Sequence, residues 1–271
     1  MKRTRRQIVW ECIFPTFFIL MMLMAALLIF SIAGSAVISL TGISEAIIYY
    51  WNKYSDLLMT LLAYVLTLFG LRHSFQYDEI RYGIDPRRTV WQHAVIAILF
   101  TFAIAELCSS LIDLVGISRI FTSYQESAES MFQGQNPLLL IITTVILGPL
   151  TEEMVFRGLT YRRIRSYVGV RKAILFSALL FGIYHMNIVQ FLFAFVVGCL
   201  FAWLYEKSGT LLVSIGAHML INLYAAIYNM QISYFQAHPQ TLLYITAVQV
   251  ILAIVAGGIL FKKRNTLFDR G

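Results

Sequence analysis

Residues Pro137 to Arg157 have the sequence PLLLIITTVILGPLTEEMVFR, which combines a long apolar run with charged side chains. Its first part is an apolar run, and about 20 consecutive apolar residues have the length of a transmembrane helix. Two adjacent carboxylates, Glu152 and Glu153, follow near its end. A charged side chain at the centre of a membrane helix costs about 2.5–3.5 kcal/mol even on a lenient scale, so two of them together indicate a functional site. The stretch therefore predicts a membrane helix that carries polar chemistry.

The composition points the same way for the whole chain. Of its 271 residues, 59% are hydrophobic and 13% are charged, and the mean hydropathy is +0.74. A soluble domain is usually about 45–50% apolar and about 25% charged. We therefore expect an all-α, polytopic membrane helix bundle without a separate soluble domain.

Hydrophobic runs of spanning length follow one another along the chain. We expect about eight transmembrane helices, near residues 12–40, 56–72, 93–117, 137–160, 173–189, 190–206, 210–230 and 241–261. The boundary between the fifth and sixth is weak, because few polar residues interrupt the apolar sequence there, so a tight turn or a re-entrant hairpin is an open alternative. The chain then divides into N-terminal helices without a recognised motif (1–135), a core (136–230) and a final helix with a basic tail (231–271).

The basic residues test this layout. The net charge is +7 and the isoelectric point is about 9.4. With the N-terminus inside, every Lys and Arg except Lys53 and Arg119 falls on the cytoplasmic side, as the positive-inside rule requires. We therefore expect both termini in the cytoplasm and a bacterial plasma membrane, with an internal eukaryotic membrane as the alternative.

The same charges indicate the partners. Basic residues lie at the ends of hydrophobic runs and form no stripe with interleaved aromatic residues, so nucleic acid is not an expected partner. Membrane lipid is expected, and the turn at Gly83–Arg88 is a candidate contact with anionic lipid.

Three of the expected helices carry polar side chains at a similar depth. Counting about 1.5 Å per residue from the cytoplasmic end places His218, Glu152 and His185 about 12, 15 and 20 Å deep. A single intramembrane histidine is often only a hydrogen-bonding group between helices. Unrelated structural residues have no need to coincide in depth, so the agreement predicts one buried polar site in the cytoplasmic half of the membrane.

Local spacing predicts how these groups pair. Glu153 and Arg157 are four residues apart on one helix face and can form an ion pair. Glu152 points about 100° away and must find another partner. His218 and Asn222 share a face in the same way. Pro149 interrupts the backbone hydrogen bonds just before the carboxylates and predicts a kink.

Taken in chain order, these residues resemble a known family. The motifs are Glu152-Glu153-x-x-x-Arg157, Phe181-x-x-x-His185 and His218-x-x-x-Asn222. They are similar to those of the CPBP family, the CAAX prenyl proteases and bacteriocin-processing enzymes, also called the Abi family. The similarity covers roughly residues 136–228 and implies an eight-helix intramembrane endopeptidase whose catalytic core lies in residues 136–230.

The resemblance also implies roles for individual residues. The implied catalytic set is Glu152, Glu153, Arg157, His185, His218 and Asn222. Glu152 with His185 would activate a water molecule, and His218 with Asn222 would hydrogen-bond the developing oxyanion. Glu153 and Arg157 would support the helix that carries Glu152. The implied reaction is hydrolysis of a peptide bond in a membrane-associated or lipidated peptide or protein.

Cofactor use has two alternatives. Glu152, His185 and His218 could supply the three protein ligands of a catalytic zinc ion. No HExxH spacing, which would put two ligands on one helix, is present. We therefore favour glutamate-activated water with no required cofactor, with a divalent metal such as zinc as the alternative.

Two other functions compete with proteolysis. A bacteriocin self-immunity or peptide-binding protein could keep the fold, although an intact set of motifs argues against a degenerate scaffold. A transporter would spread its polar residues along a path through the membrane. Here they cluster at one depth, and Glu106 on the third expected helix has no motif around it.

Overall fold

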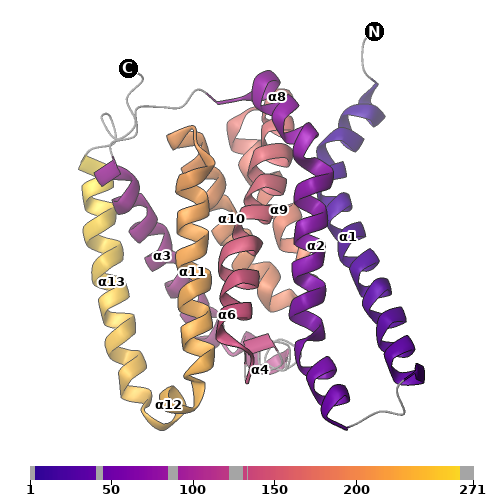
Figure 1. The fold of residues 1–271 in the computed structure, drawn as a ribbon. Helices are drawn as coiled ribbons and strands as arrows, with labels where there is room; N and C mark the ends of the chain where they lie inside the picture. Colours follow the sequence, from indigo (N-terminus) through magenta and orange to yellow (C-terminus); the bar gives the residue numbers. More distant parts are fainter. Residues whose placement is uncertain (1–3, 41–44, 85–90, 122–130, 133, 263–271) are drawn as a thin grey trace.

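The computed structural model describes residues 4–40, 45–84, 91–121, 131–132 and 134–262, and its regular elements in these ranges are all helices (Figure 1). The expected all-α bundle is confirmed. In chain order the helices are α1 (Arg5–Leu40), α2 (Glu45–Tyr82), α3 (Trp91–Leu114), α4 (Ile117–Ile120), α6 (Pro137–Leu140), η1 (Ile141–Leu147), α7 (Gly148–Glu153), η2 (Met154–Tyr161), α8 (Arg162–Val168), α9 (Val170–Tyr184), α10 (Ile188–Ser208), α11 (Leu211–Met230), α12 (Ile232–Ala237) and α13 (Pro239–Lys262).

Seven helices of the described chain are long and apolar enough to cross a membrane. They are Arg5–Ala36, Glu45–Tyr82, His93–Leu114, Pro137–Val168, Ile188–Ser208, Leu211–Met230 and Pro239–Lys262. The expected fifth span forms α9, which has 15 residues. At about 1.5 Å per residue, α9 reaches about 22 Å, short of the roughly 30 Å hydrocarbon core. The bundle therefore contains seven helices of spanning length and one shorter helix, α9, between the central helix and α10.

A tight turn joins α9 to α10. The sequence placed this boundary at 189–190, but the helices separate at His185–Asn187. The helix α10 begins after Asn187, because the Asn187 side chain accepts hydrogen bonds from the backbone N–H groups of Val189 and Gln190 and so caps the helix. Met186 completes the turn with a φ of 52°. The tight-turn alternative is confirmed, and it leaves His185 at the end of α9.

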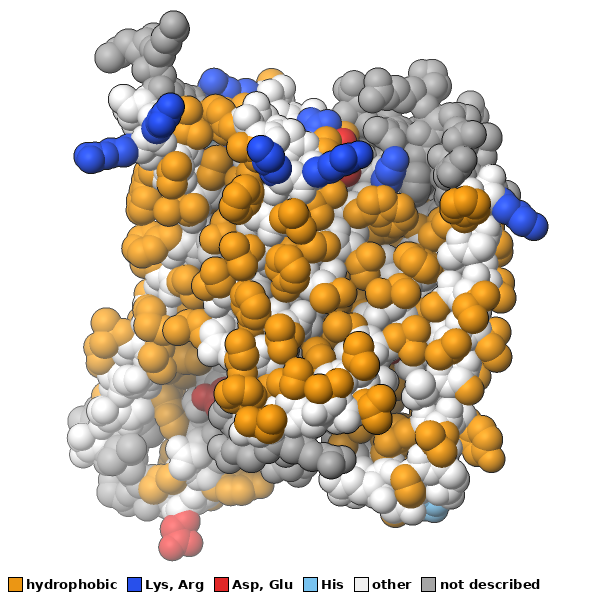
Figure 2. All heavy atoms as spheres, turned by 180° about the vertical axis from the view of Figure 1, so that it is seen from behind, with side chains coloured by type: hydrophobic (Ala, Val, Ile, Leu, Met, Phe, Trp, Pro, Cys, Tyr) orange, Lys and Arg blue, Asp and Glu red, His pale blue; other side chains and the backbone are white. Residues whose placement is uncertain are grey.

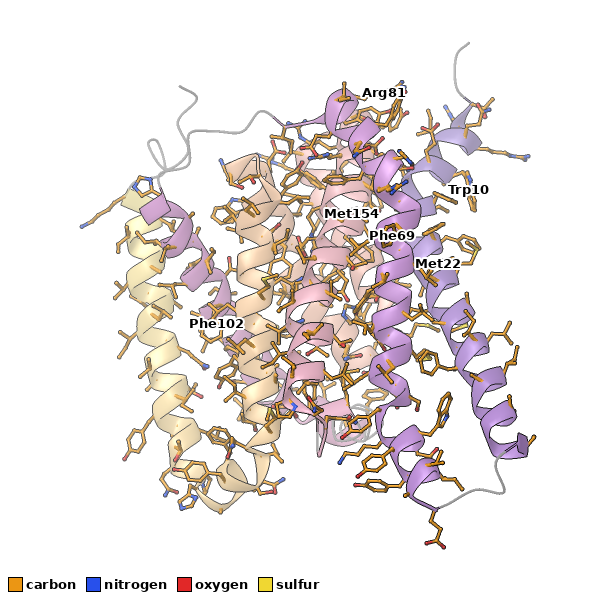
Figure 3. All side chains as sticks on the ribbon, in the orientation of Figure 1. Trp10, Met22, Phe69, Arg81, Phe102 and Met154 are labelled. Atoms are coloured by element: carbon orange, nitrogen blue, oxygen red, sulfur yellow. The ribbon has the colours of Figure 1, made fainter. Side chains whose placement is uncertain are left out.

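The continuous helix formed by residues 137–168 lies in the middle of the bundle. In Figure 1, α1 and α2 lie on one flank of it, and α3 and α13 lie on the other. All eight residues of η2, Met154–Tyr161, are buried. Side chains fill the space between the helices, whereas Trp10 and Phe69 lie on the outside, 50% and 65% exposed (Figure 3). Lipid therefore faces apolar side chains, and the η2 part of the central helix is enclosed by protein.

This central helix is not a regular α-helix. The short α segment α7 lies between two π-helical segments, η1 and η2. Pro149 lies at the start of α7 and has no N–H to donate to the preceding turn. The expected kink is thus realised as a widened helix, a form that is rare and frequently found at functional sites. Glu152 and Glu153 are the last two residues of α7.

Ion pairs hold the next helix, α8, against its neighbours. Arg163 Nε donates to Asp78 Oδ2 on α2 at 2.5 Å, and Arg165 Nε lies 2.8 Å from Glu206 Oε2 on α10. Arg162 also donates to the Tyr205 hydroxyl. The basic residues Arg162, Arg163 and Arg165, which the positive-inside rule places on the cytoplasmic side, therefore also hold the end of the central helix against α2 and α10.

The charge distribution fits the expected topology. The start of α1 and the end of α13 lie at the same end of the bundle (Figure 1). Lys and Arg side chains gather at this end, above a belt of hydrophobic side chains (Figure 2). The expected lipid contact at Gly83–Arg88 falls largely on residues 85–90, outside the described residues. The other basic residues outside them are Lys2, Arg3, Lys263, Arg264 and Arg270.

This topology can be tested by cysteine labelling. We expect Glu45→Cys, at the far end of α2, to react with a membrane-impermeant maleimide in intact cells. Arg5→Cys and Lys262→Cys should react only after the membrane is opened, because the positive-inside rule places them in the cytoplasm. All three are made after Cys12, Cys108 and Cys199 are replaced by Ser. Labelling of Arg5→Cys and Lys262→Cys on opposite sides of the membrane would contradict the fold.

Candidate active site

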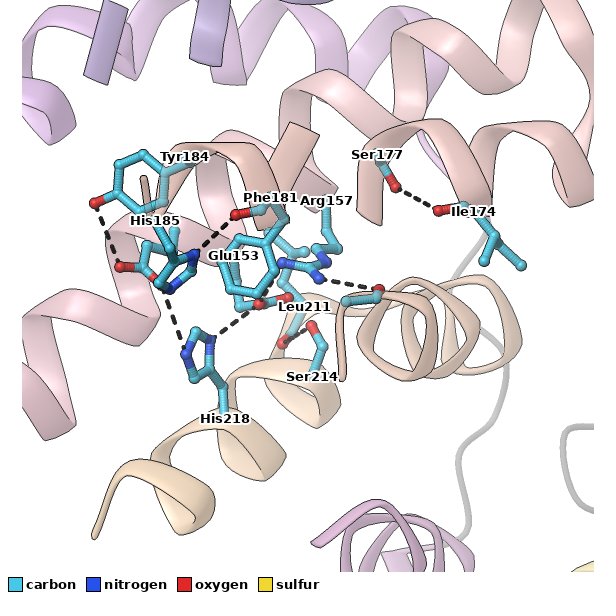
Figure 4. A network of polar contacts seen from close by, with 12 residues as sticks. Glu153, Arg157, Ile174, Ser177, Phe181, Tyr184, His185, Leu211, Ser214 and His218 are labelled. Atoms are coloured by element: carbon cyan, nitrogen blue, oxygen red, sulfur yellow. Dashed lines mark hydrogen bonds and ion pairs between the residues drawn. The ribbon is translucent and has the colours of Figure 1, made fainter. Parts of the chain in front are cut away.

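Polar residues from separate helices meet in the centre of the bundle. Glu152 and Glu153 come from α7, His218 comes from α11, and all three are buried, with exposed fractions of 6%, 0% and 5%. His218 Nδ1 lies 3.1 Å from Glu153 Oε1, and its Nε2 lies 3.6 Å from Glu152 Oε2. The imidazole therefore lies between the two carboxylates (Figure 4). Glu152 and His218, which the sequence placed at similar depth, are therefore neighbours in the structure.

Glu153 forms the expected ion pair. Arg157 Nη1 donates to Glu153 Oε1 at 2.9 Å, with both side chains fully buried. Arg157 Nη2 donates to the carbonyl of Gly198 on α10 at 3.0 Å. The guanidinium carbon lies 4.5 Å from the ring centroid of Phe181 and 5.1 Å from that of Phe201, so cation–π attraction adds to the pairing. The pair thus links the central helix to α9 and α10.

Glu152 has different partners, which the sequence did not reveal. The hydroxyl of Tyr64 on α2 donates to Glu152 Oε1 at 2.9 Å, and the hydroxyl of Tyr184 on α9 lies 3.5 Å from the same oxygen. Tyr184 directly precedes His185 in the sequence, so its closeness to the motif could have identified it as a candidate site residue. Tyr64 lies in a span without any motif, and only its phenol within an apolar run distinguishes it.

His185 is held in one tautomer by the backbone. Its Nδ1 lies 2.8 Å from the carbonyl oxygen of Phe181. A carbonyl can only accept, so Nδ1 carries the hydrogen, and Nε2 of the neutral ring is left with a lone pair. The Phe181 ring contacts both imidazoles, with centroids 4.8 Å from His185 and 5.9 Å from His218. His185 also interacts electrostatically with Glu152. It therefore offers a hydrogen-bond acceptor beside the carboxylate.

Asn222 lies one helical turn after His218. Its amide Nδ2 donates to the carbonyl of Thr144 in η1 at 2.8 Å. This bond joins α11 to the widened segment of the central helix, and the amide keeps a second N–H for another acceptor. The part that Asn222 plays in stabilising an oxyanion stays a prediction.

Glu106 lies apart from this cluster. It is buried on α3, 8% exposed, and it interacts electrostatically with Tyr224 of α11. Within the described ranges, no hydrogen bond or ion pair connects Glu106 to Glu152, Glu153 or His218.

A catalytic metal ion would need about three protein ligands that converge on one point. Among the residues that the structure describes, no three His, Cys, Asp or Glu side chains converge so that they could hold one. Glu153 Oε1 is already bonded by Arg157 and His218, and Glu152 Oε1 is bonded by Tyr64. The choice between glutamate-activated water and a zinc ion stays a prediction, and we derive no chemical step through a metal.

Comparison with known proteins agrees with the motifs. Residues 134–224 match the family model described as "Type II CAAX prenyl endopeptidase Rce1-like". A Bacillus subtilis protein, "Putative membrane peptidase YdiL", is 30% identical over 95 residues, which are 35% of this chain and 38% of that relative. No solved structure matches the chain.

The long apolar helices are those of an integral membrane protein, and the segment that carries the buried site is similar to a membrane peptidase family. The similarity to CAAX prenyl endopeptidases that the motifs indicated is thus confirmed over residues 134–224. The match spans only 38% of the curated relative.

The Glu153–Arg157 pair leads to a stability prediction. Arg157→Met removes the guanidinium and leaves the fully buried Glu153 without its counter-charge, which costs about 3–5 kcal/mol in comparable cases. We expect a strong loss of accumulation in the membrane and a lower unfolding temperature in detergent. Arg171→Met, the same substitution at an exposed position, is the control. Equal stability of the two variants would contradict the structural role of the pair.

Proposed function

We propose that this chain is an intramembrane endopeptidase that hydrolyses a peptide bond of a membrane-associated or lipidated substrate. The arrangement around Glu152 carries the proposal. One carboxylate oxygen accepts from Tyr64, and the other faces an imidazole nitrogen 3.6 Å away, beyond hydrogen-bonding distance. A buried carboxylate with one uncommitted oxygen beside two histidines suits the activation of water.

In the proposed reaction, water donates one hydrogen bond to Glu152 Oε2 and the other to His185 Nε2. Its oxygen attacks the carbonyl carbon of the substrate while a proton passes to Glu152, and a tetrahedral intermediate forms. That proton then moves to the amide nitrogen as the C–N bond breaks, giving a carboxylic acid and an amine. Every proton in this scheme comes from the attacking water, so no further reactant is needed.

The oxyanion needs hydrogen-bond donors that are already oriented. His218 Nδ1 is directed at Glu153, so Nε2 is the nitrogen that faces Glu152 and the reaction space. In the imidazolium form Nε2 donates to the oxyanion, together with the second N–H of Asn222. Glu153 and Arg157 hold His218 and the central helix in position and do not touch the substrate.

The substrate reaches the site from the membrane in this proposal. The site is predicted to lie in the cytoplasmic half of a bacterial plasma membrane, where a lipidated C-terminus or a membrane-anchored precursor can approach between helices. Matches to a CAAX prenyl endopeptidase model and to a protein named as a membrane peptidase support this substrate class.

The catalytic assignment predicts the effect of two substitutions. Glu152→Ala and His185→Ala should each abolish cleavage, because one removes the base and the other removes the second acceptor for water, while accumulation stays near normal. His238→Ala, at an exposed histidine, should cleave like the wild type. The measurement is comparative peptidomics of membranes from cells that express each protein.

Retained cleavage in Glu152→Ala would contradict this mechanism. If cellular phenotypes were the same with wild type and Glu152→Ala, a peptide-binding or immunity role would explain the protein better.

The proposed reaction requires no metal. We expect purified, active protein to contain zinc far below one equivalent per chain by elemental analysis, and we expect its activity to survive dialysis against a chelator. Stoichiometric zinc whose removal abolishes cleavage would favour the metal-dependent alternative with Glu152, His185 and His218 as ligands.

A further inference from the structure

Tyr64 joins the site from a part of the chain that carries no motif. It lies on α2, whereas the segment that matches the family model begins at residue 134. Its hydroxyl nevertheless forms the shortest hydrogen bond described for Glu152, 2.9 Å to Oε1. A second phenol at this oxygen, that of Tyr184, lies 3.5 Å away and belongs to the matched segment.

The packing around Tyr64 directs this hydroxyl. The ring is 8% exposed and belongs to a hydrophobic cluster that includes Ile19, Leu71 and Met154. Gly148, just before Pro149, lies beside the ring: a Cβ at that position would be in ordinary van der Waals contact with it, 3.4 Å from Cε2 and 3.5 Å from the oxygen. The ring is thus held by apolar contacts that do not depend on the hydroxyl, and the hydroxyl has the carboxylate as its acceptor.

The two carboxylate oxygens of Glu152 have different partners. A phenol donates a hydrogen bond to an ionised carboxylate, and such charge-assisted bonds are stronger than neutral ones. Both phenols are directed at Oε1, while Oε2 faces His218 without a hydrogen bond. A carboxylate anchored through one oxygen has a fixed orientation, and its second oxygen stays available to accept a proton.

We infer that Tyr64 is a positioning residue: its hydroxyl anchors Glu152 through Oε1 and so makes Oε2 the oxygen that accepts the proton from water. This inference rests on the proposed function. In this inference α2 contributes a side chain to the site, so the matched segment 134–224 alone does not contain every residue that positions Glu152.

The test removes only the hydroxyl. We expect Tyr64→Phe to lower kcat about 10- to 100-fold, as loss of a hydrogen bond to a charged group does, with KM nearly unchanged. Tyr184→Phe should lower kcat less, because its hydroxyl is 0.6 Å farther from Oε1 (3.5 against 2.9 Å). Tyr50→Phe, the same substitution at a position of α2 that is 57% exposed, should match the wild type. The probe is a quenched fluorogenic peptide with a farnesylated cysteine, assayed in detergent micelles.

Each outcome decides between the inference and its alternatives. Unchanged kcat in Tyr64→Phe would overturn it, and so would a raised KM with unchanged kcat, which would make Tyr64 a substrate-binding residue. Failure of Tyr64→Phe to accumulate would also overturn it, because the hydroxyl would then be a structural group. A wild-type protein that does not cleave the probe, or a Glu152→Ala variant that still does, would instead contradict the proposed function.

Discussion

Arg157 and Glu153 form an ion pair in which neither side chain is exposed, in the middle of a membrane helix bundle. No solvent is available there to compensate a lone charge, so each partner depends on the other. The pair also fixes its surroundings, because the guanidinium reaches the Gly198 carbonyl and the rings of Phe181 and Phe201. Three helices that the site needs are thereby held in one arrangement.

The two adjacent glutamates have different environments because of this pair. Glu153 Oε1 contacts both Arg157 and His218, and the Arg157 guanidinium balances the charge of the carboxylate within the core. Glu152 has no arginine or lysine among its described contacts and is held by the weaker phenol donors. A paired carboxylate is suited to hold its neighbours in place. A carboxylate with an uncommitted oxygen is suited to exchange a proton.

Much of the site could be predicted because its residues obey local rules. Glu153 and Arg157 follow the four-residue spacing that brings side chains together on one helix face. The prediction that His218 and Glu152 meet needed only the number of residues from the cytoplasmic end of each helix, and it held although η2 widens the helix that carries Glu152. The turn before α10 was less predictable, because its position depends on Asn187 capping the helix and not on hydrophobicity.

The membrane bundle, the side on which the basic residues gather, the ion pair and most of the polar residues that meet could be predicted from the amino-acid sequence. These features depend on composition and on spacing within single helices. Three features became visible only in the folded chain: α9 is a short helix, the central helix widens on both sides of α7, and Tyr64 reaches Glu152. The reason is that these features arise from packing between helices distant in sequence, where the partner of a side chain is set by the whole bundle.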